Sequence, residues 1–249
     1  MKKNILITGA TGGIGLAIAK EMGLLGYHIL INGIDRKQGA VAEEELSKLN
    51  ISHKIYYFDV TNEEAVNNGF VEIAHDVSSL HAIVNGAGGL GGRSDFESMT
   101  TDFYRRVMAL NLDSVFFVSR AGIPLLKLDK DSSIVNFTSI AAWNAGGPGA
   151  GIYGTAKAGV LTLTRALAKD LVKYGIRVNA VSPGTIDTPF HQATKDTNPA
   201  LFESWKNDIL MKRFGDASEV ATVVKFLIGP DASYLTGEVI QINGGQDFL

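Results

Sequence analysis

The chain has 249 residues, of which 45% are hydrophobic and 20% charged, and its formal net charge is −3. This composition excludes a disordered chain and supplies enough apolar material for a sizeable core. The nearly balanced charge argues against a nucleic acid or an anionic membrane as the main partner. The sequence contains no cysteine, which excludes disulfides, thiolate metal sites and cysteine nucleophiles and is consistent with a reducing cytoplasm.

The first eight residues superficially resemble the charged start of a signal peptide. Their apolar run breaks at Thr8-Gly9 after three residues, well short of the roughly 7–15 that such a segment needs. No stretch approaches the roughly 18–20 apolar residues of a membrane span. We therefore expect a soluble, unprocessed, cytoplasmic protein with neither a membrane nor a nucleic acid as partner.

Short segments rich in Ile and Val alternate with longer segments of helical periodicity along the whole chain. Both faces of the short segments are apolar, which is typical of strands covered by helices on both sides. Repeated strand–helix alternation predicts a parallel sheet with right-handed crossovers. No linker divides the chain, so we expect a single α/β domain over residues 1–249. The predicted strands are 5–7, 28–31, 54–58, 80–84, 133–137, 177–181 and 238–242, and the clearest helices are 14–25, 37–49, 63–75 and 151–174.

One segment departs from this alternation, between the sixth predicted strand and the last helix. Residues 185–213 contain two prolines and three aromatic residues that look exposed, namely Phe190, Phe202 and Trp205. Insertions of this size beside the carboxyl end of a sheet are often lids. We predict a substrate lid around 185–213, with a packed pair of surface helices as the alternative.

A glycine-rich loop, Thr8-Gly9-Ala10-Thr11-Gly12-Gly13-Ile14-Gly15, follows the first strand and opens a helix. Gly9 permits a tight turn, and Gly13 and Gly15 leave room for the backbone to approach a diphosphate. The helix offers free N–H groups and the positive end of its dipole to that anion. This strand–loop–helix context predicts a dinucleotide-binding loop. Its expected contact residues are Gly9, Thr11, Gly12, Gly13, Ile14 and Gly15.

From this loop to the carboxyl terminus the sequence resembles the short-chain dehydrogenase/reductase family. Asn85-Gly86-Ala87-Gly88 is similar to the family's Asn-Asn-Ala-Gly, with Gly86 replacing the second Asn. Further matches are Asn111, Ser139, Tyr153-x-x-x-Lys157 and Pro183-Gly184-Thr185-Ile186-Asp187-Thr188. The segments 213–215, 235–237 and 243–245 resemble those of 3-oxoacyl-carrier-protein reductases and sugar dehydrogenases.

This resemblance implies a doubly wound (Rossmann) seven-stranded parallel sheet in the order 3-2-1-4-5-6-7. A dinucleotide would lie across the carboxyl ends of the strands, between the first and the fourth. The resemblance also implies a homotetramer and the catalytic residues Asn111, Ser139, Tyr153 and Lys157. Asn111 would hold a water that links Lys157 to solvent, and Lys157 would reach the nicotinamide ribose.

The Tyr153–Lys157 pair carries the expected chemistry. Reduction of a ketone by a nicotinamide requires a hydride at carbon and a proton at oxygen. A tyrosine with its ordinary pKa near 10 is a poor proton shuttle at neutral pH. Lys157 lies about one turn after Tyr153, and its ammonium, with the oxidised nicotinamide, is expected to lower the pKa of the phenol. Ser139 can donate to the developing alkoxide; an exposed Tyr/Lys pair and an ordinary strand-ending serine are the alternatives.

The adenine end decides between NAD(H) and NADP(H). Gly33 stands where many NAD-using relatives have an acid, and Ile34 where NADP-using relatives often have an arginine. Asp35 could turn to the ribose and favours NAD(H), whereas Arg36 could meet a 2′-phosphate. We expect NAD(H) or NADP(H), with a slight preference for NAD(H). The other expected coenzyme contacts are Asp59, Val60, Asn85, Gly86, Ala87, Tyr153, Lys157, Pro183, Gly184, Ile186 and Thr188.

The substrate is the least defined part of the site. Residues 88–93, 141–144 and 185–213 are expected around it, and cations or donors come from Arg93, His191, Gln192, Lys195 and Lys206. They favour a small polar carbonyl compound such as a sugar acid, a hydroxy acid or a sugar-derived carbonyl, although solvated loop residues would look the same. A 3-oxoacyl-thioester reductase is one alternative, and a non-catalytic dinucleotide-binding regulatory protein is another. No metal site is expected, because His191 has no second ligand at a suitable spacing.

Overall fold

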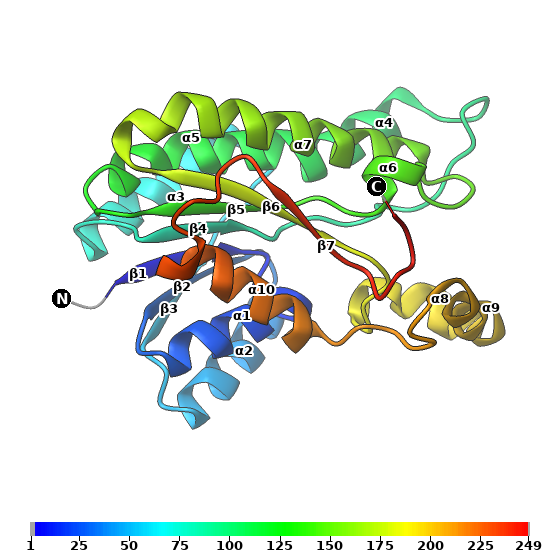
Figure 1. Ribbon diagram of the computed structural model, residues 1–249, viewed down its shortest axis with the longest axis horizontal. Helices are drawn as coiled ribbons and strands as arrows, with labels where there is room; N and C mark the ends of the chain where they lie inside the picture. Colours follow the sequence, from blue (N-terminus) through cyan, green and yellow to red (C-terminus); the bar gives the residue numbers. More distant parts are fainter. Residues whose placement is uncertain (1–2, 249) are drawn as a thin grey trace.

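The computed structural model describes residues 3–248, and within them seven strands form a sheet that is covered by helices on both faces (Figure 1). The order is β3-β2-β1-β4-β5-β6-β7 and every neighbouring pair is parallel. This confirms the predicted fold class and strand order. The strands are β1 (Asn4–Thr8), β2 (His28–Gly33), β3 (His53–Tyr57), β4 (Ala82–Asn85), β5 (Ser133–Phe137), β6 (Arg177–Pro183) and β7 (Val239–Ile242).

Two helical layers enclose the sheet. The helices α1, α2 and α10 lie on one face, and α3, α5 and α7 lie on the other (Figure 1). The helix bounds are α1 Gly13–Leu24, α2 Arg36–Lys48, α3 Glu63–Asp76, α4 Thr101–Met108, α5 Ser114–Leu126, α6 Ala141–Asn144, α7 Gly151–Leu171, α8 Gln192–Thr197, α9 Pro199–Ser204 and α10 Ala217–Ile228.

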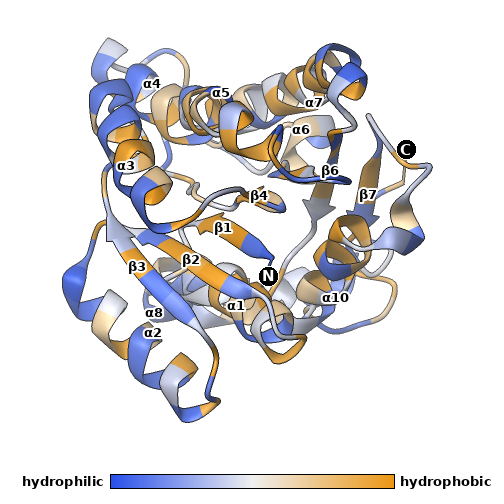
Figure 2. Ribbon diagram, turned by 90° about the vertical axis from the view of Figure 1, so that its left-hand side faces the viewer, coloured by the Kyte–Doolittle hydropathy of each residue, from blue (hydrophilic) through white to orange (hydrophobic). Residues whose placement is uncertain are grey.

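The central strand β1 shows why both faces of the strands are apolar. Ile5 and Ile7 belong to the core beneath α1 and α10, whereas Leu6 belongs to the core beneath α3 and α5, because successive side chains of a strand point to opposite faces. Figure 2 shows this hydrophobic colouring along the inner strands. Burial of each such side chain stabilises the fold by about 1.5–3 kcal/mol. Ile5 pairs with Ile29 of β2 and with Ala82 of β4, so β1 lies at the point where the strand order reverses.

The helices α4 and α5 form one continuous helical stretch, Thr101–Leu126, through a π-helical turn at Ala109–Asp113. By length and composition this stretch could cross a membrane, which the sequence reading did not anticipate. In the fold it is a core helix of the layer that contains α3 and α7, with Val118 and Leu126 fully buried. Its apolar character is therefore explained by packing on the sheet.

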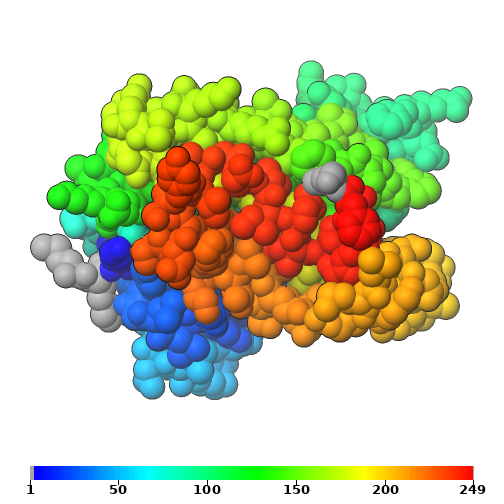
Figure 3. Space-filling view, in the orientation of Figure 1, coloured from blue at the N-terminus to red at the C-terminus, as the bar shows by residue number. Residues whose placement is uncertain are grey.

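Residues 185–213 form short helices beside the carboxyl ends of the strands, and they extend from the body next to the C-terminal segment (Figure 3). Phe202 is 4% exposed, because its ring packs 4.4 Å from that of Phe214 and 5.4 Å from that of Trp205. The expectation of an exposed Phe202 was wrong. Phe190 is 46% exposed, as expected.

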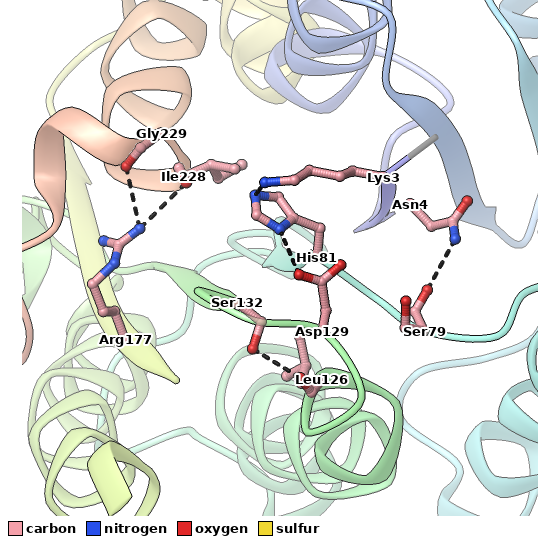
Figure 4. A network of polar contacts seen from close by, with 10 residues as sticks. All are labelled: Lys3, Asn4, Ser79, His81, Leu126, Asp129, Ser132, Arg177, Ile228 and Gly229. Carbon is pink, nitrogen blue, oxygen red and sulfur yellow. Dashed lines mark hydrogen bonds and ion pairs between the residues drawn. The ribbon is translucent and has the colours of Figure 1, made fainter. Parts of the chain in front are cut away.

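A buried polar network closes the opposite end of the sheet (Figure 4). His81 is 3% exposed and lies between Lys3 Nζ at 3.4 Å and Asp129 Oδ1 at 3.2 Å. Burial lowers the pKa of His81 despite the neighbouring carboxylate. Arg177 donates to the carbonyls of Leu227 and Ile228 near the end of α10. The carboxyl end of the sheet remains as the place for a functional site.

Candidate active site

The glycine-rich loop joins β1 to α1 in a conformation that depends on its glycines. Gly9 has φ +66°, and a Cβ there would lie 2.7 Å from Ala87 Cα. A Cβ at Gly15 would lie 2.7 Å from both Ala10 Cα and the Gly9 carbonyl oxygen. No ordinary side chain fits such contacts. The loop therefore brings the start of α1 against both β1 and the segment that follows β4.

The amino end of α1 is open and lacks a side-chain cap. Gly12 is the N-cap residue, and no side chain accepts a hydrogen bond from the first turn. A Cβ at Gly12 would meet nothing within 4 Å, and one at Gly13 would come no closer than 3.8 Å, to Thr188. Free N–H groups at a helix amino end bind phosphate. This cradle at the point of strand reversal fits the diphosphate of a dinucleotide.

Ser139 and Tyr153 meet at the carboxyl edge of the sheet, the edge at which the glycine-rich loop also lies. Ser139 follows β5 and Tyr153 lies in the first turn of α7. The Tyr153 side chain is almost fully buried. Burial raises the pKa of Tyr153 to about 12, and a hydrogen bond with Ser139 acts in the opposite direction. At neutral pH the phenol is therefore neutral and holds its proton.

Lys157 lies one turn further along α7 and is 3% exposed. Its Nζ donates a 2.8 Å hydrogen bond to the Phe137 carbonyl oxygen and lies 5.8 Å from the centre of the Tyr153 ring. Burial lowers the pKa of Lys157 to about 8. The sequence predicts that Lys157 lowers the pKa of Tyr153, but in the protein alone desolvation dominates and the pKa of the phenol is raised.

Asn111 occupies the π-helical turn Ala109–Asp113. Its Nδ2 donates to the carbonyls of Gly89 at 2.8 Å and Val107 at 2.9 Å, and its Oδ1 accepts from the Gly89 N–H at 3.0 Å. These bonds explain how a residue of low helix propensity is held inside a helix. Turns of this type occur frequently at functional sites. Nothing in the sequence marked this turn.

Gly88 lies where the side chains of Asn111 and Lys157 approach each other. The sequence did not indicate this position for Gly88. A Cβ at Gly88 would lie 3.0 Å from Asn111 Oδ1 and 3.1 Å from Lys157 Nζ. The two polar groups therefore approach the same point of the backbone from different helices. In the sequence, Gly88 is marked by its place after Asn85-Gly86-Ala87. This motif shows that a glycine is present, but not which side chains approach it.

A polar network behind the site holds the strands and helices that carry these residues. Asn85 Nδ2 donates to Asn136 Oδ1 at 2.8 Å and to Ser119 Oγ at 2.9 Å, and Asn136 Nδ2 donates to Thr164 Oγ1 at 2.9 Å. These four residues lie in β4, β5, α5 and α7. Thr138 Oγ1 donates to the Lys157 carbonyl oxygen at 2.9 Å. The Asn85 side chain, expected at the coenzyme, thus takes part in this network.

At the adenine end, both side chains expected to select the coenzyme have contacts within the protein. One carboxylate oxygen of Asp35 accepts from the backbone N–H groups of Lys37 at 2.8 Å and Gln38 at 3.3 Å, so Asp35 caps α2. The Arg36 guanidinium lies 4.5 Å above the centre of the Tyr57 ring. A Cβ at Gly33 would lie 2.4 Å from Thr11 Cγ2, so a side chain at this position would have to displace the Thr11 methyl group.

The remaining expected coenzyme residues lie in or next to the segments that follow the strands at the carboxyl edge of the sheet. Asp59 Oδ1 accepts from the N–H and the hydroxyl of Thr61, both at 2.8 Å. The Ala87 N–H donates to Thr8 Oγ1 at 3.2 Å, and the Gly184 N–H donates to the Ile242 carbonyl oxygen at 2.9 Å. The side chains of Val60, Ile186 and Thr188 are buried, Gly86 and Pro183 lie at the ends of β4 and β6, and Thr11 and Ile14 lie in the loop and the first turn of α1.

The fold and this arrangement define a dehydrogenase or reductase that uses a nicotinamide dinucleotide. A family profile described as Enoyl-(Acyl carrier protein) reductase matches residues 9–247. The chain belongs to the short-chain dehydrogenase/reductase family, and it is accordingly a short-chain NAD(P)-dependent dehydrogenase/reductase acting on ketones and alcohols. The resemblance drawn from the motifs is confirmed.

Particular relatives show a range of substrates. The chain is 35% identical to the 3-oxoacyl-[acyl-carrier-protein] reductase FabG of Aquifex aeolicus, over 96% of this chain and 95% of the relative. It is 31% identical to the 7alpha-hydroxysteroid dehydrogenase of Bacteroides fragilis, over 98% of this chain and 93% of the relative. A crystal structure of the NADH-dependent reductase A1-R′, responsible for alginate metabolism, superposes with a TM-score of 0.90 at 32% identity, covering 100% of this chain and 98% of that one.

Proposed function

We propose that the protein interconverts a ketone and a secondary alcohol on a small polar substrate, with Tyr153 as the acid and base. The observation that supports this most is the buried Tyr153 phenol, which contacts Ser139 and has Lys157 beside it at the open end of the sheet. The nicotinamide, when bound, supplies or accepts the hydride. The cradle formed by Gly9–Gly15 would hold its diphosphate, with Lys157 toward the nicotinamide ribose.

The protonation states support catalysis in the direction of reduction. Because the pKa of Tyr153 is raised to about 12, the phenol carries a proton that it can donate to a developing alkoxide. Ser139 would stabilise the same oxygen through its hydroxyl. Lys157, with a pKa lowered to about 8, is protonated at pH 7 and would stabilise the phenolate left after transfer. Asn111 would position the loop at Gly89 and a water beside Lys157.

We propose NAD(H) or NADP(H) as the coenzyme, with NAD(H) as the first choice. This choice rests on the Asp35 carboxylate, which follows β2 and caps α2, whereas the Arg36 guanidinium lies over the Tyr57 ring. Titration of the purified protein with NADH and NADPH, followed by coenzyme fluorescence, measures the two dissociation constants. A tenfold tighter binding of NADPH would reverse this choice.

The acid/base role is tested with Tyr153→Phe. We expect loss of ketone reduction, followed by nicotinamide absorbance, with the dissociation constant for coenzyme within about twofold of the wild-type value. Tyr174→Phe is the matched control, since Tyr174 follows the same helix and is 43% exposed. Reduction by Tyr153→Phe at more than a tenth of the wild-type rate would contradict the proposed role.

A second candidate is reduction of a 3-oxoacyl thioester. The similarity to FabG over almost the entire chain supports it. Reduction of the N-acetylcysteamine thioester of 3-oxobutanoate, compared with free oxo acids at equal concentration, separates the two candidates. A thioester kcat/KM more than tenfold above that of every oxo acid would favour the second one.

We further propose that the protein is cytoplasmic and assembles as a homotetramer, as the family resemblance implies. Light scattering of the purified chain measures the assembly. A mass equal to one chain, 26.6 kDa, at micromolar concentration would contradict the tetramer.

A further inference from the structure

Among the cationic and polar side chains expected around the substrate, most already have a partner. Lys195 forms an ion pair with Asp187, and Lys206 forms one with Glu203. Gln192 Nε2 donates to Asp196 Oδ1 at 2.7 Å. Within residues 3–248, Arg93 forms no ion pair. It is therefore the cation of this group whose charge no carboxylate neutralises.

The surroundings of Arg93 place it near the start of the catalytic helix. Its Nη1 donates to the Pro148 carbonyl oxygen at 2.6 Å, and a Cβ at Gly149 would lie 2.9 Å from Arg93 Cβ. The next residue, Ser94, donates its backbone N–H to the Gly149 carbonyl oxygen at 3.0 Å. This contact fixes the loop that contains Arg93 against the segment just before α7, in which Tyr153 is the third residue.

Phe190 and His191 connect the Tyr153 side chain to the segment after β6. The Phe190 ring lies 6.1 Å from that of Tyr153, and the His191 ring lies 4.9 Å from that of Phe190. Burial lowers the pKa of His191 to about 4. The positive charges of Lys195 and Arg93 also lower this pKa, whereas the negative charge of Asp187 raises it. His191 is thus neutral at pH 7, and the charge of Arg93 contributes to the lowering of its pKa. Within the described residues no hydrogen bond involves its ring nitrogens.

We propose that Arg93 binds a carboxylate of the substrate and that His191 donates a hydrogen bond to the same group. The proposal rests on the function proposed above and narrows its substrates to oxo acids and the corresponding hydroxy acids. The planar guanidinium fork matches a carboxylate with two parallel hydrogen bonds. The carboxylate does not react: the carbonyl carbon gains a hydride from the reduced coenzyme and the carbonyl oxygen gains the Tyr153 proton, which gives a hydroxy acid and oxidised coenzyme.

Binding can be measured independently of turnover through the fluorescence of the two tryptophans of the chain, Trp143 and Trp205. The Trp205 ring lies 5.5 Å from that of His191. The probes are 3-oxobutanoate and 4-oxopentanoate, each paired with its uncharged methyl ester. We expect the better acid to bind roughly 10- to 100-fold more tightly than its ester, and its kcat/KM to be higher by a similar factor.

The decisive variant is Arg93→Gln, with Lys206→Gln as the matched control. Arg93→Gln should remove the preference for acid over ester, because the kcat/KM of the acid falls by a larger factor than that of the ester. Lys206→Gln should keep the preference, because Lys206 already forms an ion pair. Arg93→Lys keeps a charge but not the planar fork, so it should retain part of the preference. Equal losses for acid and ester in Arg93→Gln, or no preference in the wild type, would overturn the proposal.

Failure of this proposal can be distinguished from failure of the proposed function. If neutral ketones and esters are reduced but the acids have no advantage, the carboxylate site is wrong and the oxidoreductase remains. If the acids quench tryptophan fluorescence in the wild type but not in Arg93→Gln, while no carbonyl compound is reduced, the site is correct and the function is wrong. Should Arg93→Gln unfold, the fluorescence and kcat/KM preferences of folded Arg93→Lys decide: an undiminished preference overturns the proposal.

Discussion

Gly13→Ala tests whether the amino end of α1 binds the coenzyme. Gly13 has φ +53°, and the nearest atom to a Cβ there is Thr188 Cβ at 3.8 Å. The substitution therefore causes no clash, but it places a side chain in a left-handed conformation, which costs about 1–2 kcal/mol. For a chain of this length we expect the unfolding midpoint to fall by roughly 2–8 °C. The new methyl group also stands where the diphosphate would approach the helix.

Two other glycines separate the effect on stability from the effect on coenzyme binding. Gly26 has φ +90° with nothing within 4 Å of a Cβ, so Gly26→Ala should show the conformational cost without any effect on coenzyme. Gly12 has φ −173° and an equally open position, so Gly12→Ala places a methyl group in the cradle without the left-handed strain. Coenzyme fluorescence gives the dissociation constants, and we expect a loss of at least tenfold for Gly13→Ala and none for Gly26→Ala. Unchanged affinity in a destabilised Gly13→Ala would refute the assignment of the cradle.

Three further predictions concern charge and volume. Because the pKa of Lys157 is lowered to about 8, its ammonium is lost as pH rises through that value. In a pH profile, kcat/KM for reduction should therefore fall above pH 8. The Lys157→Arg variant should lack this inflection. The pKa of His81 is lowered in the fold. The stability that neutral His81 contributes above about pH 6.5 should therefore be lost as pH falls below that value. The His81→Gln variant should show a weaker dependence of the unfolding midpoint on pH. Gly33→Asp should destabilise the chain, since the new Cβ meets Thr11. The double variant with Thr11→Ala should regain this stability, and it should bind NADPH about tenfold more weakly than the wild type.

The fold could be predicted from the sequence because its determinants are local and repeated. Ile5, Leu6 and Ile7 give both faces of β1 apolar side chains, and buried apolar residues recur in the same way in β2 and β4. The glycine spacing likewise predicted a loop whose geometry requires glycine at Gly9 and Gly15. The strand pattern, the positive φ of Gly9 and the contact of Gly15 with Ala10 depend on neighbouring residues, so a sequence pattern expresses them well.

Other features depend on contacts between distant residues, which no local pattern records. Phe202 looked exposed until its packing against Phe214 was seen. Asp35 looked free for the ribose, although its cap on α2 follows from its position before a helix and could have been anticipated. The sequence could not show that Lys195 forms an ion pair whereas Arg93, among the described residues, forms none. This difference depends on whether a carboxylate lies nearby in the fold.

The direction of the Tyr153 pKa shift shows what the coenzyme must contribute. Burial alone disfavours both the phenolate and the Lys157 ammonium, so the protein by itself holds a neutral phenol beside a weakened cation. Such a pair suits proton donation to an alkoxide but opposes proton abstraction from an alcohol. With Tyr153 in the proposed role, oxidation would require additional positive charge at the site, which an oxidised nicotinamide carries and a reduced one lacks. The site would thus favour the phenolate only when the coenzyme bound there is the form that oxidation consumes.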